Sequence, residues 1–345
     1  MTRRLFRNDG PLNAKYLGNS QYNLSIKLPT DRDGRLAREC PAEDCSPGYF
    51  KVKLGTGLSG QDDAYCPYCR QRAAANDFAT QEQARYAKDL VLREAHQRIR
   101  GMMRDALGLG ASGRRSLGGG LLSIELRDRS QPLPPVRRPF EDEVRRDVIC
   151  PHCTLDQTVF GLATWCADCG QDIFLTHIVA ELDVARLMVG DIGRRKELLG
   201  KRVASKDLEN CLEDLVTIFE AALRAMVRRA LALRGESSEQ VQARLQKIGN
   251  AFQSIRRCRE HMKDVLGFDL GAAPLWDRLA VAFEKRHPVA HNLGVIDRKY
   301  LERVQVAEAE GREVRIDGAE IEALITDVTD AIKIIHGGVI AAAAP

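Results

Sequence analysis

The spacing of hydrophobic and polar residues divides the chain into a turn-rich first part and a helical second part. Alternating patterns predict short strands at Leu24–Leu28 and Tyr49–Leu54. A run of helix-forming residues without proline predicts a helix from about Thr80 to Leu107. The pattern of Leu121–Leu126 predicts another strand, which follows a glycine-rich loop at Gly108–Gly120.

Beyond about residue 175, apolar residues recur at steps of three and four, which is the spacing of one buried helix face. Ser237 and Gln240 form a capping box, so a helix should begin there. Pro288 should interrupt the helix that contains it. The predicted helices are Thr176–Val189, Ser205–Arg234, Ser237 to about Leu266, Leu275 to about His291, and Gly318–His336.

The composition is that of a folded globular protein, because 44% of the 345 residues are hydrophobic and 29% are charged. No apolar run approaches the roughly 20 residues of a membrane span. The basic start, Met1–Arg7, lacks the apolar core of a signal peptide. We therefore expect a cytoplasmic protein without membrane contact, whose cysteines are reduced. The net charge of +4 permits nucleic acid as a partner but does not by itself indicate one.

Four of the ten cysteines form two Cys-x-x-Cys pairs with twelve residues between the pairs. Two intervening residues let both thiolates of one turn face the same ion, and a second such turn completes a tetrahedron. Gly170, which follows the last of these cysteines, suits the tight turn. The spacing predicts a zinc site formed by Cys150, Cys153, Cys166 and Cys169.

A second set of cysteines has four residues inside its first pair and 20 residues between its pairs. It predicts a second Zn²⁺ site, formed by Cys40, Cys45, Cys66 and Cys69. His152 and His177 lie near the other set in sequence, but four cysteines already fill a tetrahedral site. Cys211 and Cys258 stand alone in helical patterns and should be buried as small apolar residues.

Both sets consist only of cysteine, so neither zinc ion would keep an open position for water or substrate. The two ions are therefore expected to be structural. The small zinc-ribbon-like modules that they would hold could bind nucleic acid or protein, or could only stabilise a small domain. The expected fold class is α+β and multidomain. It comprises a zinc-ribbon-like domain at 1–78, a helix and glycine-rich linker at 79–120, a strand, proline-rich connector and second ribbon at 121–175, and an all-helical domain at 176–345.

The densest polar cluster of the helical half is Arg286-His287-Pro-Val-Ala-His291-Asn292. On an ideal helix the five steps from Arg286 to His291 turn through about 500°, so the two side chains would face different ways. Pro288 distorts a helix and Gly294 should end it. We therefore expect the polar side chains to converge at a bent helix end.

The sequence Arg-His-x-x-x-His resembles the Arg-x(4–6)-His motif of the HEPN superfamily, helical-bundle domains of many bacterial RNA-cleaving toxins and antiphage effectors. The long helix before the motif and the position of the motif before the last helix are also similar. The resemblance covers roughly residues 176–340. It implies a HEPN-like bundle, a homodimer in which two motifs meet at one cleft, and a metal-independent endoribonuclease that acts as a toxin or antiphage effector.

By the same resemblance, Arg286 and His291 would be catalytic, and His287 and Asn292 would support them. The chemistry agrees, because cleavage of RNA through its 2′-hydroxyl needs a base and an acid, and histidine titrates near neutral pH. Arginine supplies a planar set of donors that matches phosphate oxygens. One histidine and one arginine per chain do not supply both an acid and a base. A second copy of the chain, related by a two-fold axis, would supply the missing group.

Three other interpretations remain open. A charged run at a helix end is often only a solvated cap. The protein could instead be a non-catalytic adaptor, which binds nucleic acid or protein through its ribbons and dimerises through its helices. It could also be a purely structural partner in a toxin–antitoxin complex or a larger defence complex, with another protein or an antitoxin bound to it. The sequence contains neither the G-x-x-x-x-G-K-[ST] phosphate loop nor the G-x-S-x-G nucleophile elbow.

Overall fold

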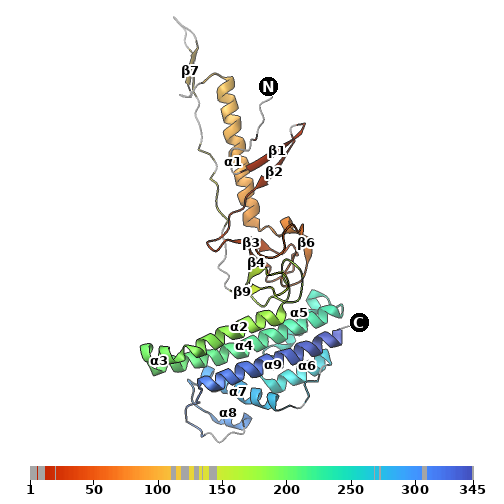
Figure 1. Cartoon of the computed structure of the whole chain (residues 1–345), viewed down its shortest axis with the longest axis vertical. Helices are drawn as coiled ribbons and strands as arrows, with labels where there is room; N and C mark the ends of the chain where they lie inside the picture. The colour runs from red at the N-terminus through yellow and green to blue at the C-terminus, as the bar shows by residue number, and fades with distance from the viewer. Residues whose placement is uncertain are drawn as a thin grey trace.

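The computed structural model describes residues 6, 12–19, 21–109, 114–117, 124–127, 132–133, 135–139, 146–267, 269–271, 273–304 and 309–343. Figure 1 shows an elongated molecule with an arm at one end, a cysteine-bearing sheet in the middle and a helical bundle at the other end. The expected α+β fold class is confirmed, because small antiparallel sheets precede a mainly helical C-terminal part.

The arm consists of helix α1 (Gln81–Ala106) and the hairpin of β1 (Leu12–Gly18) and β2 (Gln21–Ile26). Thr80 and Gln83 form a reciprocal capping box that begins α1. Apolar residues of the hairpin pack against the helix face that contains Leu90. The helix and the strand predicted for these two segments are both confirmed.

A second hairpin, of β7 (Arg114–Leu117) and β8 (Ile124–Arg127), lies near the tip of the arm in Figure 1. Strand β8 agrees with the strand predicted at 121–126, although residues 121–123 lie outside the described residues. Strand β7 lies inside the segment predicted as a glycine-rich loop, and that part of the prediction was wrong.

The middle part is one four-stranded antiparallel sheet whose strands come from both cysteine-rich segments. Its order is β3 (Arg35–Glu39), β4 (Tyr49–Lys53), β10 (Asp156–Val159) and β9 (Arg146–Ile149). Strand β4 agrees with the predicted strand and pairs directly with β10. The core under this sheet therefore contains cysteines of both sets, together with aromatic side chains such as Phe50.

Two shorter elements complete this part. Strands β5 (Asp63–Tyr65) and β6 (Arg72–Ala74) form a small hairpin around one cysteine turn. The 3-10 helix η1 (Ala75–Phe78) follows and buries Phe78 against Phe50, with ring centroids 6.0 Å apart. This apolar contact fixes the cysteine turn to the sheet.

The helical bundle is built around α4, whose buried face contacts α2, α7 and α9. The apolar residues that predicted these helices form one continuous core. The helices are α2 (Phe174–Gly190), α3 (Ile192–Leu199), α4 (Lys201–Leu233), α5 (Ser238–Ile248), α6 (Ile255–Leu266), α7 (Pro274–His291), α8 (Arg298–Arg303) and α9 (Gly318–Ala343), with the 3-10 helix η2 (Ala251–Gln253) between α5 and α6.

Two predictions about helix continuity were wrong. The segment from Ser237 begins with the expected capping box but forms two helices, because Gly249 adopts a φ of 56° and ends α5. Conversely, α7 continues through Pro288. Pro288 lies in the last turn of α7, where a missing N–H removes one helical hydrogen bond and little helix remains to be broken.

The sheet and the bundle are joined by a cluster of charged and aromatic side chains. The guanidinium groups of Arg70 and Arg229 both lie over the indole ring of Trp165, with their carbons 4.3 and 4.5 Å from the ring centroid. Asp172 forms an ion pair with Arg229, and its Oδ2 lies 3.8 Å from Nε2 of His336 on α9. These contacts connect both cysteine segments to α4 and α9.

Candidate functional site

The eight cysteines predicted as ligands lie in two clusters of four. Within each cluster all sulfur atoms lie within 4.8 Å of one another. The Sγ atoms of Cys40 and Cys69 are 3.6 Å apart, and those of Cys153 and Cys166 are 3.5 Å apart. A disulfide is much shorter, roughly 2.05 Å. Four sulfurs around an ion bound at about 2.3 Å would be about 3.8 Å apart, so each cluster can hold a metal ion.

Three of the four turns that carry the cysteines share one hydrogen-bond pattern. In one of them the N–H of Cys66 donates to the carbonyl oxygen of Gln71 at 2.9 Å. The N–H of Tyr68 in the same turn points at Sγ of Cys66, at 3.4 Å. The turns at Cys150 and Cys166 repeat both interactions. N–H groups aimed at sulfur stabilise a thiolate, which is the form that binds metal.

The two clusters are connected by reciprocal backbone hydrogen bonds. The N–H of Tyr65 donates to the carbonyl oxygen of Ala167 at 2.8 Å. Reciprocally, the N–H of Trp165 donates to the carbonyl oxygen of Pro67 at 3.0 Å. Gly170 has the positive φ expected of its tight turn, and a Cβ there would meet the ring of Tyr65 at 2.9 Å. Because β4 and β10 also pair, the two clusters belong to one double unit.

The four thiols of one cluster cannot all ionise without a cation between them. Hydrogen bonds with Cys66 and Cys69, followed by burial, raise the pKa of Cys45. The corresponding bonds from Cys45 and Cys66 lower the pKa of Cys69 to about 2. The thiols therefore titrate as one coupled group, in which the charge on one sulfur opposes the charge on the next. A divalent cation that replaces these protons would allow all four sulfurs to ionise.

Other histidines and cysteines lie outside the two clusters, as expected. His177 is buried, and its Nδ1 accepts a hydrogen bond from the N–H of Ala163 at 2.8 Å. Cys211 and Cys258 are buried in the helical core. Among the described residues, the groups with metal-binding geometry contain cysteine alone. The donor set is therefore that of a closed, structural metal site.

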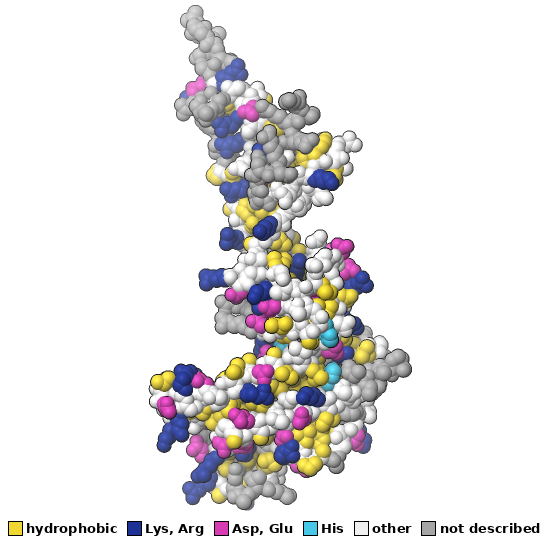
Figure 2. Space-filling view, viewed as in Figure 1, with side chains coloured by type: hydrophobic (Ala, Val, Ile, Leu, Met, Phe, Trp, Pro, Cys, Tyr) yellow, Lys and Arg dark blue, Asp and Glu magenta, His cyan; other side chains and the backbone are white. Residues whose placement is uncertain are grey.

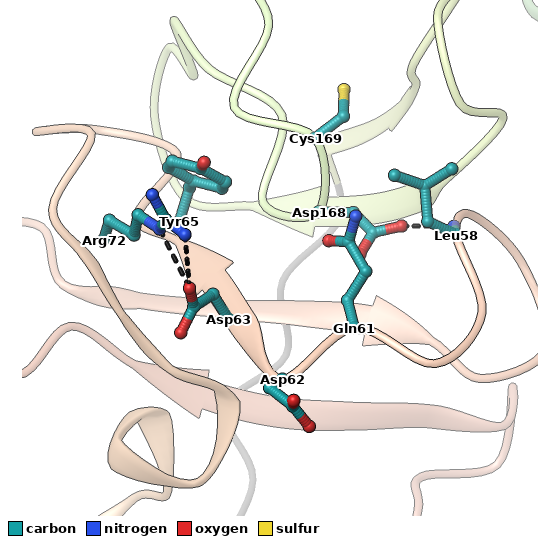
Figure 3. A pocket seen from close by; sticks show the side chains of 8 residues that line it. All are labelled: Leu58, Gln61, Asp62, Asp63, Tyr65, Arg72, Asp168 and Cys169. Atoms are coloured by element: carbon teal, nitrogen blue, oxygen red, sulfur yellow. Dashed lines mark hydrogen bonds and ion pairs between the residues drawn. The ribbon is translucent and has the colours of Figure 1, made fainter.

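A pocket of about 370 Å³ lies beside Cys169, between the two cysteine segments (Figure 3). Two of its carboxylates already have partners: Asp63 forms an ion pair with Arg72, and Asp168 accepts a hydrogen bond from the N–H of Leu58. In Figure 3 these side chains lie along the pocket wall and tie the loop around Leu58 to the last cysteine turn. The pocket contains none of the predicted catalytic residues.

The predicted histidines lie together at the C-terminal end of α7. The ring centroids of His287 and His291 are 5.2 Å apart, one helical turn from each other. His291 is exposed, whereas the side chain of His287 is 24% exposed, and its Nε2 lies 3.7 Å from Oδ2 of Asp297. The structure thus brings two imidazoles and one carboxylate to the same helix end.

Basic side chains of α8 lie near His287 and change its pKa. Burial, followed by the positive charges of Lys299, His291 and Arg303, lowers the pKa of His287, and Asp297 opposes them. The combination of neutral imidazole and nearby cations suits the binding of a phosphate. Sequence reasoning gave no role to Asp297, Lys299 or Arg303, and only the N-cap position of Asp297 before a short helix could have indicated one.

Arg286 is turned away from the two histidines. Its Nη1 donates to Oε1 of Gln253 on η2 at 3.0 Å, while its Nε is buried without a partner. Gln253 in turn donates to Oε2 of Glu220 at 2.7 Å, and Arg224 pairs with the same carboxylate. Within the described part of the chain, no hydrogen bond or ion pair joins Arg286 to His291. The expected convergence of Arg286 with His291 at a bent helix end is therefore not observed, because α7 continues through Pro288 and helical geometry keeps the two positions facing different ways.

Asn292 shapes the turn that follows α7. Its Nδ2 donates to the carbonyl oxygen of Val295 at 2.7 Å, and its N–H donates to the carbonyl oxygen of Pro288 at 2.9 Å. Gly294 follows with a φ of 83° and completes the chain reversal. Of the four predicted site residues, the structure therefore groups His287 and His291, assigns Asn292 to the turn and directs Arg286 into the bundle.

A scan of the chain against family models, and searches among curated proteins and solved structures, found no match. Among the helices of the described residues, none combines the length and the apolar character that a membrane span requires.

Proposed function

We propose that the protein is a metal-independent endoribonuclease, which cleaves RNA by attack of a 2′-hydroxyl on the adjacent phosphate. The observation that carries this proposal is the pair of imidazoles at the end of α7, 5.2 Å apart. Two imidazoles at this separation can serve as the base and the acid of one cleavage step. Lys299 and Arg303, whose charges act on His287, would attract the phosphate.

The remaining parts of the proposal rest on the HEPN resemblance. Arg286 would bind the phosphate. Its guanidinium would then have to release the side chain of Gln253 and donate to a phosphate oxygen instead. Asn292 would support the pair by shaping the turn that follows α7. In a cell, such an enzyme would act as a toxin or an antiphage effector.

The exposed apolar side chains of α2 and α3 support a homodimer of the helical part. Leu187 is 75% exposed and Leu198 is 68% exposed, and Val184 and Leu199 beside them are 55% exposed. Figure 2 shows apolar side chains gathered over these helices on the side that faces the viewer. Clustered apolar surface of this kind is typical of a protein interface. We propose that a second copy of the chain covers it.

We also propose that both metal ions are Zn²⁺. Four thiolates with tetrahedral spacing are the ligand set that zinc prefers for structural sites. In this proposal the ions hold the double unit together and take no part in cleavage. Metal analysis of the purified protein should give two zinc ions per chain, and any other dominant metal would contradict the assignment.

The ribonuclease proposal is tested with purified wild-type protein and mixed cellular RNA, without added divalent ions. His287→Ala and His291→Ala should each lower cleavage by about 100-fold or more, the usual contribution of a general acid or base. His96→Ala, the same change at an exposed position on the arm, is the matched control and should cleave like wild type. Cleavage that persists in His291→Ala would refute the assignment.

A second candidate function is a non-catalytic adaptor that binds nucleic acid. Two observations favour it: Arg286 is engaged with Gln253, and basic side chains lie along the arm in Figure 2. Exposed examples are Lys15, Lys27, Lys88, Arg137 and Arg138. An adaptor of this kind would bind nucleic acid with an affinity that falls steeply with salt, and would leave the RNA intact.

A further inference from the structure

Asp297 contacts two different elements through its two carboxylate oxygens. Its Oδ1 accepts a hydrogen bond from the N–H of Tyr300 at 2.8 Å and so caps helix α8. Its Oδ2 lies 3.7 Å from Nε2 of His287. One oxygen is thus used for the fold, and the other faces the histidine pair.

The backbone around Asp297 is held in place from both sides. The N–H of Ile296 donates to the carbonyl oxygen of Arg312 at 2.8 Å, and the N–H of Gly311 donates back to Ile296 at 2.8 Å. The side chains of Ile296 and Tyr300 are buried in a small core of their own. A carboxylate on such a support keeps its direction relative to His287, because neither its backbone nor its capping bond is free to rotate.

The chemistry of the contact decides where a neutral imidazole carries its proton. A neutral imidazole has one N–H, and an ionised carboxylate can only accept a hydrogen bond. Oδ2 of Asp297 lies 3.7 Å from Nε2, beyond hydrogen-bond distance, so its negative charge acts on the ring electrostatically and favours the tautomer that carries its proton on Nε2. The lone pair is then on Nδ1, which becomes the basic nitrogen of the site.

The charged groups around His287 come from three elements. His291 lies on the same helix, Lys299 and Arg303 lie on α8, and Asp297 lies in the connecting turn. Arg303 is also paired with Glu284 of α7, at 3.0 Å. Burial and the three cationic groups disfavour a proton on His287. His291 is exposed in the last turn of α7.

We propose that Asp297 is a positioning residue that fixes His287 in the tautomer with its proton on Nε2 and thereby makes Nδ1 the base. The role of that base rests on the ribonuclease function proposed above. In the cleavage step, the proton of the 2′-hydroxyl passes to Nδ1 of His287 as the 2′-oxygen bonds to phosphorus. The bond from phosphorus to the 5′-oxygen breaks, and protonated His291 delivers a proton to that oxygen. The products are a 2′,3′-cyclic phosphate and a free 5′-hydroxyl.

The test is nitrogen-15 NMR of the histidine side chains in the full-length, metal-loaded protein. The His287 signals are assigned by their loss in His287→Gln. Asp297→Asn keeps an oxygen for the cap of α8 but turns a donor toward His287, so its preferred tautomer should invert to Nδ1–H. Asp297→Ser retains a cap without any group that reaches His287, and should give a mixture of tautomers.

The matched control is Asp317→Asn. Asp317 also accepts a backbone hydrogen bond at the start of a helix, from the N–H of Glu320 at 2.9 Å. This change removes a carboxylate from a helix start elsewhere in the bundle, and the His287 signals should stay as in wild type. An unchanged tautomer and titration of His287 in both Asp297 variants, with α8 intact, would overturn the assignment.

A cleavage assay separates this inference from the ribonuclease proposal. Asp297→Asn should lower the cleavage rate by about 100-fold or more, because the base then has the wrong tautomer. The wild-type pH–rate profile should rise through the pKa of His287, and removal of the negative charge should move that limb to lower pH. If the tautomer inverts but wild type cleaves no RNA, the positioning role stands and the ribonuclease proposal fails.

Discussion

At the scale of residues, helical geometry separates the two sides of the predicted motif. His287 and His291 are one turn apart and share a face, whereas Arg286 points to Gln253 and the bundle interior. Adjacent positions on a helix differ by about 100° in direction, which accounts for the division. The histidines are therefore available to a ligand, while the arginine contributes first to the contact between α7 and η2.

Because Arg286 contacts the bundle and His291 is exposed, we expect substitution of the arginine, but not of the histidine, to lower the stability of the fold. Arg286→Ala should lower the free energy of unfolding by about 1–3 kcal/mol, because the amide of Gln253 loses its charged partner. His291→Ala, at an exposed position, should leave the melting temperature within the error of measurement. Thermal denaturation of both variants checks the difference. Unchanged stability of Arg286→Ala, together with lost cleavage, would show that the arginine acts on RNA alone.

At the scale of elements, the two cysteine clusters are coupled through a shared sheet. Strand β4 pairs with β10, and the hydrogen bonds of Tyr65 and Trp165 cross from one cysteine turn to the other. Cysteines from both clusters also lie in one apolar core. The stability of each metal site therefore depends on the fold of the other.

We expect Cys166→Ser to affect the metal content of both clusters. Loss of one ligand should empty its own site, and the neighbouring site should lose affinity because the backbone before its second turn, at Tyr65, is hydrogen-bonded to Ala167. Metal analysis after purification should give clearly less than one ion per chain. A value of one ion, tightly bound at the intact site, would contradict the coupling.

The sequence predicted the long elements and the metal ligands well, because both depend on local spacing. Strand β4 and helices α2, α4, α7 and α9 follow from periodicity, helix α1 follows from its run of helix-forming residues, and the cysteine clusters follow from the size of one turn. It did not predict that β4 pairs with β10, since strands this short leave no sequence signal for a distant partner. The direction of Arg286 and the role of Asp297 depend on tertiary contacts with η2 and α8, and spacing cannot supply these.

At the scale of the whole molecule, the sheet and the bundle are joined at Asp172. Burial alone would raise the pKa of Asp172, but the nearby imidazole of His336, the hydrogen bond from the N–H of Phe174 and the hydrogen-bonded guanidinium of Arg229 hold that pKa well below the usual range. A lowered pKa means that the folded state binds the proton less well than the unfolded state. The carboxylate therefore stabilises the fold above its ordinary pKa of 3.8, and this contribution is lost as the pH falls below that value.

Asp172→Asn should therefore destabilise the protein near neutral pH by about 1–3 kcal/mol, the loss of one charged hydrogen-bonding partner. The gap in stability between wild type and variant should narrow as the pH falls below 3.8. Denaturant titrations at several pH values measure the gap directly. A gap that stays constant across this range would contradict an ionised Asp172 at the junction.

The proposed homodimer also belongs to this scale. Leu187→Glu places a charge on the most exposed apolar residue of α2 and should shift the protein from dimer to monomer in light scattering after gel filtration. Gln242→Glu adds the same charge at an exposed position on α5 and should remain dimeric. A monomeric wild type, or a dimeric Leu187→Glu, would show that this face is not the interface.

The ribonuclease proposal is tested most directly by incubating RNA with the wild-type protein, without added divalent ions, and determining the chemical groups at the ends of the cleaved RNA. Attack by the 2′-hydroxyl predicts 2′,3′-cyclic phosphate and 5′-hydroxyl ends, and these should be absent with His287→Ala and His291→Ala. Chelators should be avoided, because they would also strip the cysteine clusters. Ends that carry a 3′-hydroxyl and a 5′-phosphate, or intact RNA with the fold and both metals retained, would contradict the account.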